Sequence, residues 1–177
     1  YLVRSDQPNY AEALRLIGLM RKEQPRNGSL ILLAKQLGQY QQVKVGGSLP
    51  AFKATTLDGR AFTQQDFASA TGVVLVWASW NYESYGHLRA LQDAKDKNPA
   101  LQVLTINLDA SRKDCERMMK QNGITLPTVC DGRMLDSPLL ARLSLNYVPD
   151  DIVVERGRVV ARTMTSSDLR KKFVENN

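Results

Sequence analysis

Val73-Val74-Leu75-Val76-Trp77-Ala78-Ser79-Trp80 is the stretch of sequence that decides the fold. Its first half is an uninterrupted apolar run of the length of one strand, which is typical of a buried strand. The run passes into a short loop flanked by two tryptophans, and a helical pattern follows over residues 84–95. A buried strand, a short loop and a helix in this order predict the beginning of a βαβ unit.

Strands and helices alternate along the rest of this region. The apolar patterns predict further strands near residues 101–108, 127–130, 152–155 and 158–162, and helices near residues 112–121, 138–143 and 167–175. Gly157 lies in a tight turn between the last two strands, where a positive φ is needed, so these strands are expected to form a hairpin. The predicted fold is therefore α/β, with a mixed central sheet and helices on both faces.

The first 42 residues have a helical pattern of apolar residues and no strand pattern. Apolar residues recur there at helical spacing in two sets, Tyr10, Leu14, Ile17 and Met20, then Leu30, Leu33, Leu37 and Tyr40. Pro8 or Asn9 could begin the first helix, and Asn27-Gly28-Ser29 supplies a turn and an N-cap for the second. We expect residues 1–42 to be a helical segment, the remnant of a preceding domain or a linker from it, and residues 43–177 to be the α/β domain.

Composition restricts the class of protein. The chain has 177 residues, of which 43% are hydrophobic and 24% charged, as in folded globular proteins. Its net charge is +6, but the densest cationic cluster, Arg170-Lys171-Lys172, fits the last turn of a helix better than a nucleic-acid site. No apolar run approaches the roughly 20 residues of a membrane-spanning helix. Because the sequence begins at Tyr1 without a signal-peptide pattern, we expect a piece of a longer protein.

Motifs for metals and phosphates are missing from the sequence. One histidine, His87, and two separated cysteines, Cys115 and Cys130, cannot build a structural zinc site. There is no glycine-rich dinucleotide-binding or P-loop motif. The sequence therefore predicts no metal and no cofactor.

The strand and loop quoted above resemble the thioredoxin-like superfamily, in particular the secreted thiol-disulfide oxidoreductases grouped with alkyl hydroperoxide reductase and thiol-specific antioxidant proteins. In those proteins Trp-Ala-Ser-Trp leads directly into Cys-x-x-Cys. Residues 45–52 with 57–60 resemble the hairpin at the start of the family's fold, and Leu108-Asp109 resembles its second βα junction. Tyr147-Val148-Pro149 resembles the segment that carries a cis-proline. The resemblance covers residues 43–175 and implies a thioredoxin fold.

The family's redox dithiol has no counterpart at the matching positions. Asn81 and Ser84 stand there, within Trp80-Asn81-Tyr82-Glu83-Ser84. The family's chemistry needs a thiolate that attacks a disulfide and a second thiol that resolves the mixed disulfide. Many thioredoxins also carry a buried carboxylate two residues before the first tryptophan, where this chain has Leu75, and Asp150-Asp151 follow Pro149 where the family often has threonine. The resemblance thus implies a degenerate active site.

Three functions remain open from the sequence. The first is a non-catalytic module that binds a peptide or protein at the loop, with candidate contact residues Trp80, Asn81, Tyr82, Glu83, Ser84, Val148 and Pro149. The second is a structural module of a larger exported bacterial protein, located in the periplasm or at the cell surface. The third is a divergent thiol-disulfide oxidoreductase or antioxidant protein.

The third function would use Cys115, Cys130 or both. These cysteines could equally be core thiols, a disulfide or a reactive pair. His87 follows Ser84 by three residues, so the two could share a helix face as a nucleophile pair. No acid that would orient His87 is evident, which favours a solvated or capping histidine. We expect no enzymatic activity, no nucleic-acid partner and no membrane span.

Overall fold

The structure is a computed structural model that describes residues 10–175. The chain divides after Lys44 into two compact units.

The first unit is a pair of helices, α1 (Tyr10–Glu23) and α2 (Gly28–Gln42). Asn27 caps α2, since its Oδ1 accepts hydrogen bonds from the backbone N–H groups of Ser29 and Leu30. A small apolar cluster joins the helices, formed by Ala13, Ile17 and Leu37 with Leu14 and Ala34 beside them. The two predicted helices are confirmed, while the expected start at Pro8 or Asn9 lies outside the described residues.

The second unit is built on a five-stranded sheet with the order β5-β4-β3-β6-β7. Its strands are β3 (Thr71–Trp77), β4 (Gln102–Asn107), β5 (Thr128–Val129), β6 (Asp150–Glu155) and β7 (Arg158–Arg162). Strands β3, β4 and β5 are parallel, and β6 and β7 join them antiparallel. The mixed sheet expected from the sequence is confirmed, and β3 lies at its centre.

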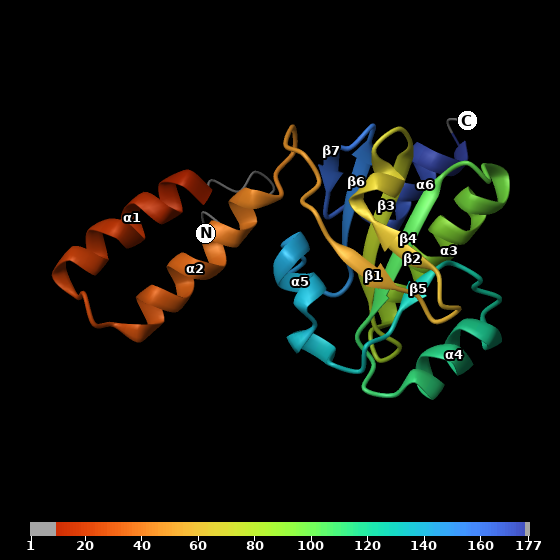
Figure 1. Cartoon of the computed structure of the whole chain (residues 1–177), viewed down its shortest axis with the longest axis horizontal. Coiled ribbons are helices and arrows are strands. Elements are labelled where there is room, and N and C mark those ends of the chain that lie inside the picture. Colours follow the sequence, from red (N-terminus) through yellow and green to blue (C-terminus); the bar gives the residue numbers. More distant parts are fainter. Residues whose placement is uncertain (1–9, 176–177) are drawn as a thin grey trace. The chain divides into compact units, whose positions relative to one another are not determined.

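Helices cover the sheet on both faces (Figure 1). They are α3 (Tyr82–Lys97), α4 (Arg112–Gln121), α5 (Pro138–Leu143) and α6 (Ser166–Arg170), which continues as a π-helical turn η3 (Lys171–Glu175). Helices α3 and α6 pack on one face, and α5 lies on the other side of the sheet (Figure 1). This three-layer arrangement is the thioredoxin fold, as predicted.

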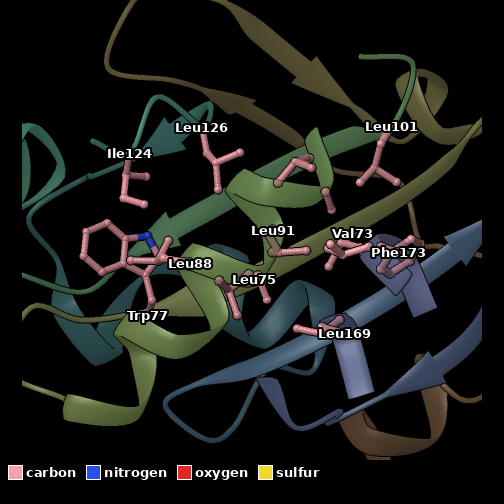
Figure 2. Close-up of a cluster of buried hydrophobic side chains, with 14 of the residues drawn as sticks. Val73, Leu75, Trp77, Leu88, Leu91, Leu101, Ile124, Leu126, Leu169 and Phe173 are labelled. Atoms are coloured by element: carbon pink, nitrogen blue, oxygen red, sulfur yellow. The ribbon is translucent and has the colours of Figure 1, made fainter. Parts of the chain in front are cut away.

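The main core lies between β3 and α3. Val73, Leu75 and Trp77 alternate along β3 toward Leu88 and Leu91 of α3 (Figure 2). All of these side chains are fully buried. Because every residue of β3 after Thr71 is buried, the strand has no solvent-facing side, which explains the continuous apolar run in its sequence.

A buried polar chain crosses this part of the sheet. The indole Nε1–H of Trp77 donates to Thr105 Oγ1 at 3.1 Å, and Thr105 Oγ1 is 2.7 Å from Thr128 Oγ1. Thr128 in turn donates to the carbonyl of Leu126 at 2.8 Å. Each buried donor therefore has a partner, so the strand can place Trp77 in the core without leaving its N–H unsatisfied.

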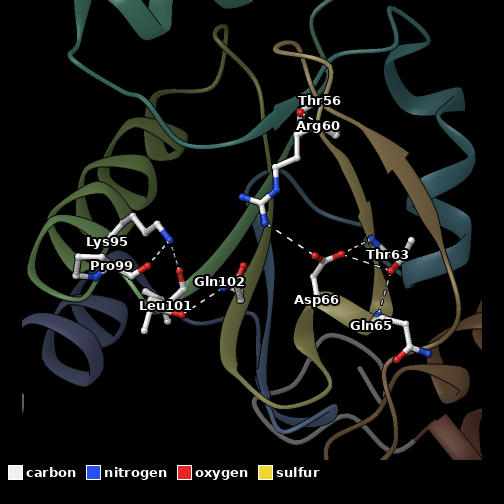
Figure 3. Close-up of polar contacts among 10 residues, drawn as sticks. Thr56, Arg60, Thr63, Gln65, Asp66, Lys95, Pro99, Leu101 and Gln102 are labelled. Carbon is white, nitrogen blue, oxygen red and sulfur yellow. Dashed lines mark hydrogen bonds and ion pairs between the residues drawn. The ribbon is translucent and has the colours of Figure 1, made fainter.

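A small hairpin precedes the sheet, formed by β1 (Lys53–Thr55) and β2 (Ala61–Thr63). Thr63 and Asp66 form a capping box that begins the 3₁₀ turn η1 (Gln64–Phe67), and Arg60 pairs with Asp66 at 3.9 Å (Figure 3). Lys95 holds the turn after α3 by donating to the carbonyls of Pro99 and Leu101 (Figure 3). These local contacts fix the connections on either side of β3.

The chain reverses between β6 and β7 in a tight turn at Arg156 and Gly157. Both residues have positive φ, 50° and 76°, as a two-residue hairpin turn requires. The predicted hairpin and the predicted conformation of Gly157 are confirmed. The segment before β6 contains a second short 3₁₀ turn, η2 (Met134–Asp136), and then α5.

Candidate functional site

The candidate site is the loop of residues 78–81, which joins the buried end of β3 to α3. Asn81 is the N-cap of α3, and its Oδ1 accepts from the backbone N–H of Ser84 at 2.9 Å. Asparagine is one of the preferred N-cap residues because its side chain satisfies an amide that has no partner within the helix. The loop can therefore be short, and the helix begins at Tyr82, two residues before the start that the apolar pattern indicated.

Asn81 and Ser84 are hydrogen-bonded to each other through their side chains. Ser84 is fully buried, and its Oγ donates to Asn81 Oδ1 at 3.1 Å while it accepts from the backbone N–H of Ala78 at 3.2 Å. Asn81 Nδ2 donates to the carbonyl of Val148 at 2.9 Å. This network, which we call the Asn81–Ser84 bridge, ties the loop to a segment 67 residues further along the chain.

The segment that Asn81 reaches is the one with the proline singled out in the sequence. The Val148–Pro149 peptide bond is cis. Val148 and Pro149 are half-buried, and Tyr147 before them is 43% exposed. The structure thus joins Asn81 directly to Ser84 and to Val148, and Pro149 follows Val148 in the chain.

The remaining predicted contact residues lie on the outside of the loop. Trp80 is 59% exposed and Tyr82 is 94% exposed, and Glu83 is exposed beside them. Tyr85, one turn along α3, is also exposed. Large exposed aromatic side chains gathered around one loop are uncommon on a soluble protein and are typical of contact surfaces.

Asp109 holds the other side of the loop, a role that the sequence analysis missed. Its Oδ1 accepts from both the backbone N–H and the hydroxyl of Ser79, each at 3.0 Å. Its Oδ2 accepts from Asn107 Nδ2 at 3.0 Å, and the side chain is 4% exposed. The sequence singled out Leu108-Asp109 only for its resemblance to the family's second βα junction. The alternation of apolar residues with Asn107 and Asp109 at the end of β4 is the signal that could have indicated a buried polar role for Asp109.

His87 does not form the nucleophile pair that its spacing from Ser84 allowed. The hydroxyl of Ser84 is used by Asn81 and Ala78, as described above. The two ring nitrogens of His87 instead face two carbonyl oxygens, Nδ1 that of Glu83 and Nε2 that of Met164, both at 3.0 Å. His87 therefore ties α3 to the segment before α6, and the nucleophile hypothesis is wrong for this arrangement.

A buried acidic pair follows the proline at the start of β6. Asp150 is 2% exposed and accepts from Asn146 N–H and from Thr163 Oγ1, and Arg162 lies 3.7 Å from its Oδ2. Burial raises the pKa of Asp150, against the effect of Arg162. These contacts anchor the proline segment to β7.

Asp151 is the second member of that pair and is fully buried. It lies directly across from Leu75 on the neighbouring strand. Its Oδ2 accepts from Met164 N–H at 3.0 Å, and its Oδ1 has no hydrogen-bond partner among residues 10–175. Burial, followed by the charge of Asp150, raises the pKa of Asp151 to about 7. Leu75 is not acidic, but Asp151, which in the sequence was only a departure from the family's threonine, brings a carboxylate to the same part of the sheet from β6.

The two cysteines lie away from the loop, on α4 and after β5. Both are free thiols, Cys115 buried and Cys130 half-buried. Burial raises the pKa of each.

Within the described residues no group of three or more histidine, cysteine or acidic side chains could hold a metal ion. The same part of the chain contains no helix that is both long and apolar enough to span a bilayer.

Solved structures with this fold include several oxidoreductases. The C-terminal domain of a protein assigned as a thiol-disulfide oxidoreductase from Bacteroides thetaiotaomicron has a TM-score of 0.64 at 24% identity, over 77% of this chain and 99% of that one. A thiol-disulfide oxidoreductase from Bacteroides fragilis has a TM-score of 0.62 at 25% identity, over 72% and 98%. A secreted disulfide oxidoreductase from Mycobacterium tuberculosis has a TM-score of 0.60 at 18% identity, over 70% and 95%.

Sequence comparison gives the family directly. No curated protein matches the chain significantly. The sequence profile of the AhpC/TSA family matches residues 45–162, which is well over half of the chain and includes β1 through β7. Together with the thioredoxin fold, this match shows that the chain belongs to the AhpC/TSA family.

Proposed function

We propose that this chain is a non-catalytic thioredoxin-like module that binds an extended peptide segment of a partner protein at the loop after β3. The observation that carries the proposal is the Asn81–Ser84 bridge. It stands at the two positions where the resemblance of Trp77–Trp80 to the family places the dithiol. An amide cannot attack a disulfide and a hydroxyl cannot form one, so the family's reaction has no nucleophile at this place.

The proposed binding surface consists of Trp80, Tyr82, Tyr147, Val148 and Pro149, and we call it the loop surface. Its two most exposed aromatic side chains, Trp80 and Tyr82, are of the kind that dominates binding energy at interfaces. Glu83 lies at its rim.

The backbone of Val148 supports the choice of an extended peptide as partner. Its carbonyl is used by Asn81, whereas its N–H has no acceptor among the residues that the structure describes. A free backbone donor on a half-buried segment can pair with the carbonyl of a chain that lies alongside it, as in strand addition. We therefore propose a partner that offers one backbone acceptor and apolar or aromatic side chains for the loop surface.

The alternative is a divergent oxidoreductase or antioxidant protein that uses Cys115 and Cys130. Burial raises the pKa of both thiols, so little thiolate exists at neutral pH. Reactive cysteines are usually more exposed and have lowered pKa values. This chemistry argues against turnover and places the alternative second.

A location in the periplasm or at the cell surface of a bacterium completes the proposal. It is supported by the secreted disulfide oxidoreductase from Mycobacterium tuberculosis, which has the same fold. We propose that residues 1–42 are then the helical end of a preceding part of a larger exported protein. If no ligand binds the loop surface, a purely structural role for the module is the function that remains.

A redox assay tests the non-catalytic part of the proposal. We expect no reduction of insulin disulfides and no consumption of peroxide above a buffer control. Turnover that disappears in Cys115→Ala or Cys130→Ala would overturn the proposal in favour of the alternative. As a positive control for the alignment, the double variant Asn81→Cys/Ser84→Cys should form a disulfide, and its residue-81 thiol should titrate below the ordinary value of about 8.5 because it begins a helix.

A binding assay tests the loop surface. Peptides selected from a displayed random library on the full chain should bind Trp80→Ala and Tyr82→Ala roughly tenfold or more weakly than the unchanged protein, as measured by calorimetry. Leu135→Ala is the matched control, since Leu135 is an apolar residue in η2 whose exposure lies between those of Trp80 and Tyr82. Selected peptides that bind all four proteins equally would contradict the proposed surface, and failure to select any peptide would favour the structural role.

A further inference from the structure

A groove lies between β1 and α5, and we call it the β1–α5 groove. Helix α5 lies beside β1 (Figure 1), and Arg142 Nε donates to the carbonyl of Ala51 at 2.7 Å, which joins the helix to the segment before the strand. The groove has a volume of about 470 Å³ and is lined by Ala51, Phe52, Lys53, Pro138, Leu139 and Arg142. Small-molecule sites have volumes of roughly 300–1,000 Å³, so this groove has the size of such a site. It shares no lining residue with the loop surface.

The most buried lining residues of the groove are apolar. Phe52 is 7% exposed and Leu139 is 8% exposed, whereas Ala51 and Pro138 are exposed. The ring of Phe52 packs against that of Phe67, with 6.3 Å between the ring centroids, which holds Phe52 in place. An apolar group that enters the groove would therefore meet a fixed apolar surface and remove more of that surface from water.

Two cations lie at the same groove without an acidic partner. Lys53 and Arg142 are exposed, and neither forms an ion pair with any residue that the structure describes. None of the six lining residues is acidic, and Asp136, the acid nearest in sequence to either lining segment, is not among them.

Arg142 is held at the groove in a way that leaves donors available. Its Nε bonds the carbonyl of Ala51, while its two terminal nitrogens have no hydrogen-bond partner in the described part of the chain. A guanidinium with free N–H groups can pair with a carboxylate through two parallel hydrogen bonds. The groove therefore combines an apolar surface with a donor pair that suits a carboxylate.

We propose that the β1–α5 groove binds a small organic acid, whose apolar body packs on Phe52 and Leu139 and whose carboxylate pairs with Arg142. Lys53 adds a second positive charge beside that carboxylate. An inorganic anion would use the cations alone and leave the apolar surface in water. A neutral apolar molecule would leave both cations without a counter-charge, so the two features together select an anion with an apolar body.

The dimensions of the groove favour a small molecule over a protein segment. Its six lining residues are few compared with the roughly 20–30 residues that each side of a standard protein interface contributes. Because Lys53 and Arg142 are exposed, their attraction to the carboxylate is modest and should weaken as salt is added. The inference does not depend on the function proposed for the loop surface.

Nuclear magnetic resonance titration of the isotope-labelled full chain with naphthoate tests the groove. Naphthoate should shift the backbone amide signals of residues 51–53 and 139–142 saturably and leave the indole signal of Trp80 unchanged. Two further probes separate its parts, since naphthamide has the same apolar body without the charge and acetate has the carboxylate without the body. Each should bind at least roughly fivefold more weakly than naphthoate, because each lacks one of the two contributions.

Substitutions at the exposed groove residues make the test specific. Arg142→Gln should weaken naphthoate binding roughly fivefold or more, and Lys53→Gln roughly twofold, because the arginine is held at the groove and the lysine is a flexible point charge. Ala51→Glu should abolish binding by placing an acidic side chain beside the cations. Lys113→Gln is the control, since it removes an exposed cation from α4, and it should bind naphthoate as the unchanged protein does. Circular dichroism checks that each variant is folded.

Several results would overturn the inference. They are naphthamide binding as tightly as naphthoate, shifted amides that lie at the loop surface or spread over the whole domain, and groove variants that bind like Lys113→Gln. The absence of a saturable shift up to the solubility limit of naphthoate would also refute it. If the groove signals respond only to peptides selected on the full chain, the groove belongs to a protein partner and the small-molecule assignment is wrong.

Discussion

Replacing Asp151 with asparagine should change how the stability of this protein depends on pH. Asp151 is fully buried on β6, and one of its carboxylate oxygens accepts from Met164 N–H while the other has no partner among the described residues. Burial, and after it the charge of Asp150, raises its pKa from an ordinary 3.8 to about 7. Asparagine keeps an oxygen for Met164 and cannot ionise.

The direction and size of the effect follow from that pKa. Between pH 4 and pH 7 the folded state holds a proton on Asp151 that the unfolded state has released, so the free energy of unfolding falls as the pH rises through this range. The two pKa values correspond to a loss of up to about 4 kcal/mol by pH 8. Asparagine leaves its amide N–H groups buried, which costs about 1–3 kcal/mol at every pH.

We therefore expect Asp151→Asn to be less stable than the unchanged protein at pH 4 and more stable by roughly 1–3 kcal/mol at pH 8. Urea unfolding followed by circular dichroism at several pH values between 4 and 8 measures both curves. Asp136→Asn is the control for the substitution itself, because Asp136 is exposed in η2. A difference between Asp151→Asn and the unchanged protein that is the same at pH 4 and pH 8 would show that Asp151 does not titrate in this range.

Substitutions at three further positions test the packing at the start of β3, the helix cap in the loop and the contact between α3 and the segment before α6. Gly72→Ala should lower the free energy of unfolding in urea by about 1–3 kcal/mol, because the new Cβ would lie 2.5 Å from Phe67 Cδ1 and 2.7 Å from the carbonyl oxygen of Gln102. Gly28→Ala is the control and should not destabilise the protein, because the space around Gly28 is open. Asn81→Ala should lose about 0.5–2 kcal/mol with the helix cap, and Asn81→Asp should keep the cap yet free the Val148 segment, seen as faster hydrogen exchange around Tyr147. His87→Ala should cost about 1–3 kcal/mol and speed exchange in α6, since the ring joins Glu83 to Met164; unchanged exchange in α6 would contradict that role.

The fold could be predicted because its signals are local. The run from Val73 to Trp77 is apolar at every position, and the strand is buried on both faces, so pattern and burial agree. Cap residues and turn glycines, such as Asn27 and Gly157, likewise act within a few residues of their own positions. The start of α3 was placed two residues late because the polar first turn, Tyr82 and Glu83, carries no apolar periodicity, and only the cap geometry of Asn81 reveals it.

The supports of the site could not be predicted because they join distant strands. Asp109 bonds Ser79 across 30 residues, and Asp151 lies opposite Leu75 only through the antiparallel register of β3 and β6. In the sequence Asp151 follows a proline and another acid, where a turn at the surface would be the ordinary interpretation. Burial of such a residue depends on which strands pair with each other, and strand pairing between distant segments cannot be read from a single sequence.

The Asn81–Ser84 bridge holds the loop through oxygen and nitrogen atoms at the two positions to which the resemblance assigns the family's cysteines. A thiol pair at the start of a helix would leave the carbonyl of Val148 without its present donor, whereas the Asn81 amide caps the helix and binds that carbonyl at once. Ser84 is completely buried, and its hydroxyl both donates to Asn81 and accepts from Ala78, so its polar group costs little where it lies. Each of these bonds holds the loop to its neighbours, and none of them leaves a nucleophile free at its surface. The same bonds leave Trp80 and Tyr82 exposed beside a hydrogen-bonded loop, which supports the binding role that we propose for the loop surface.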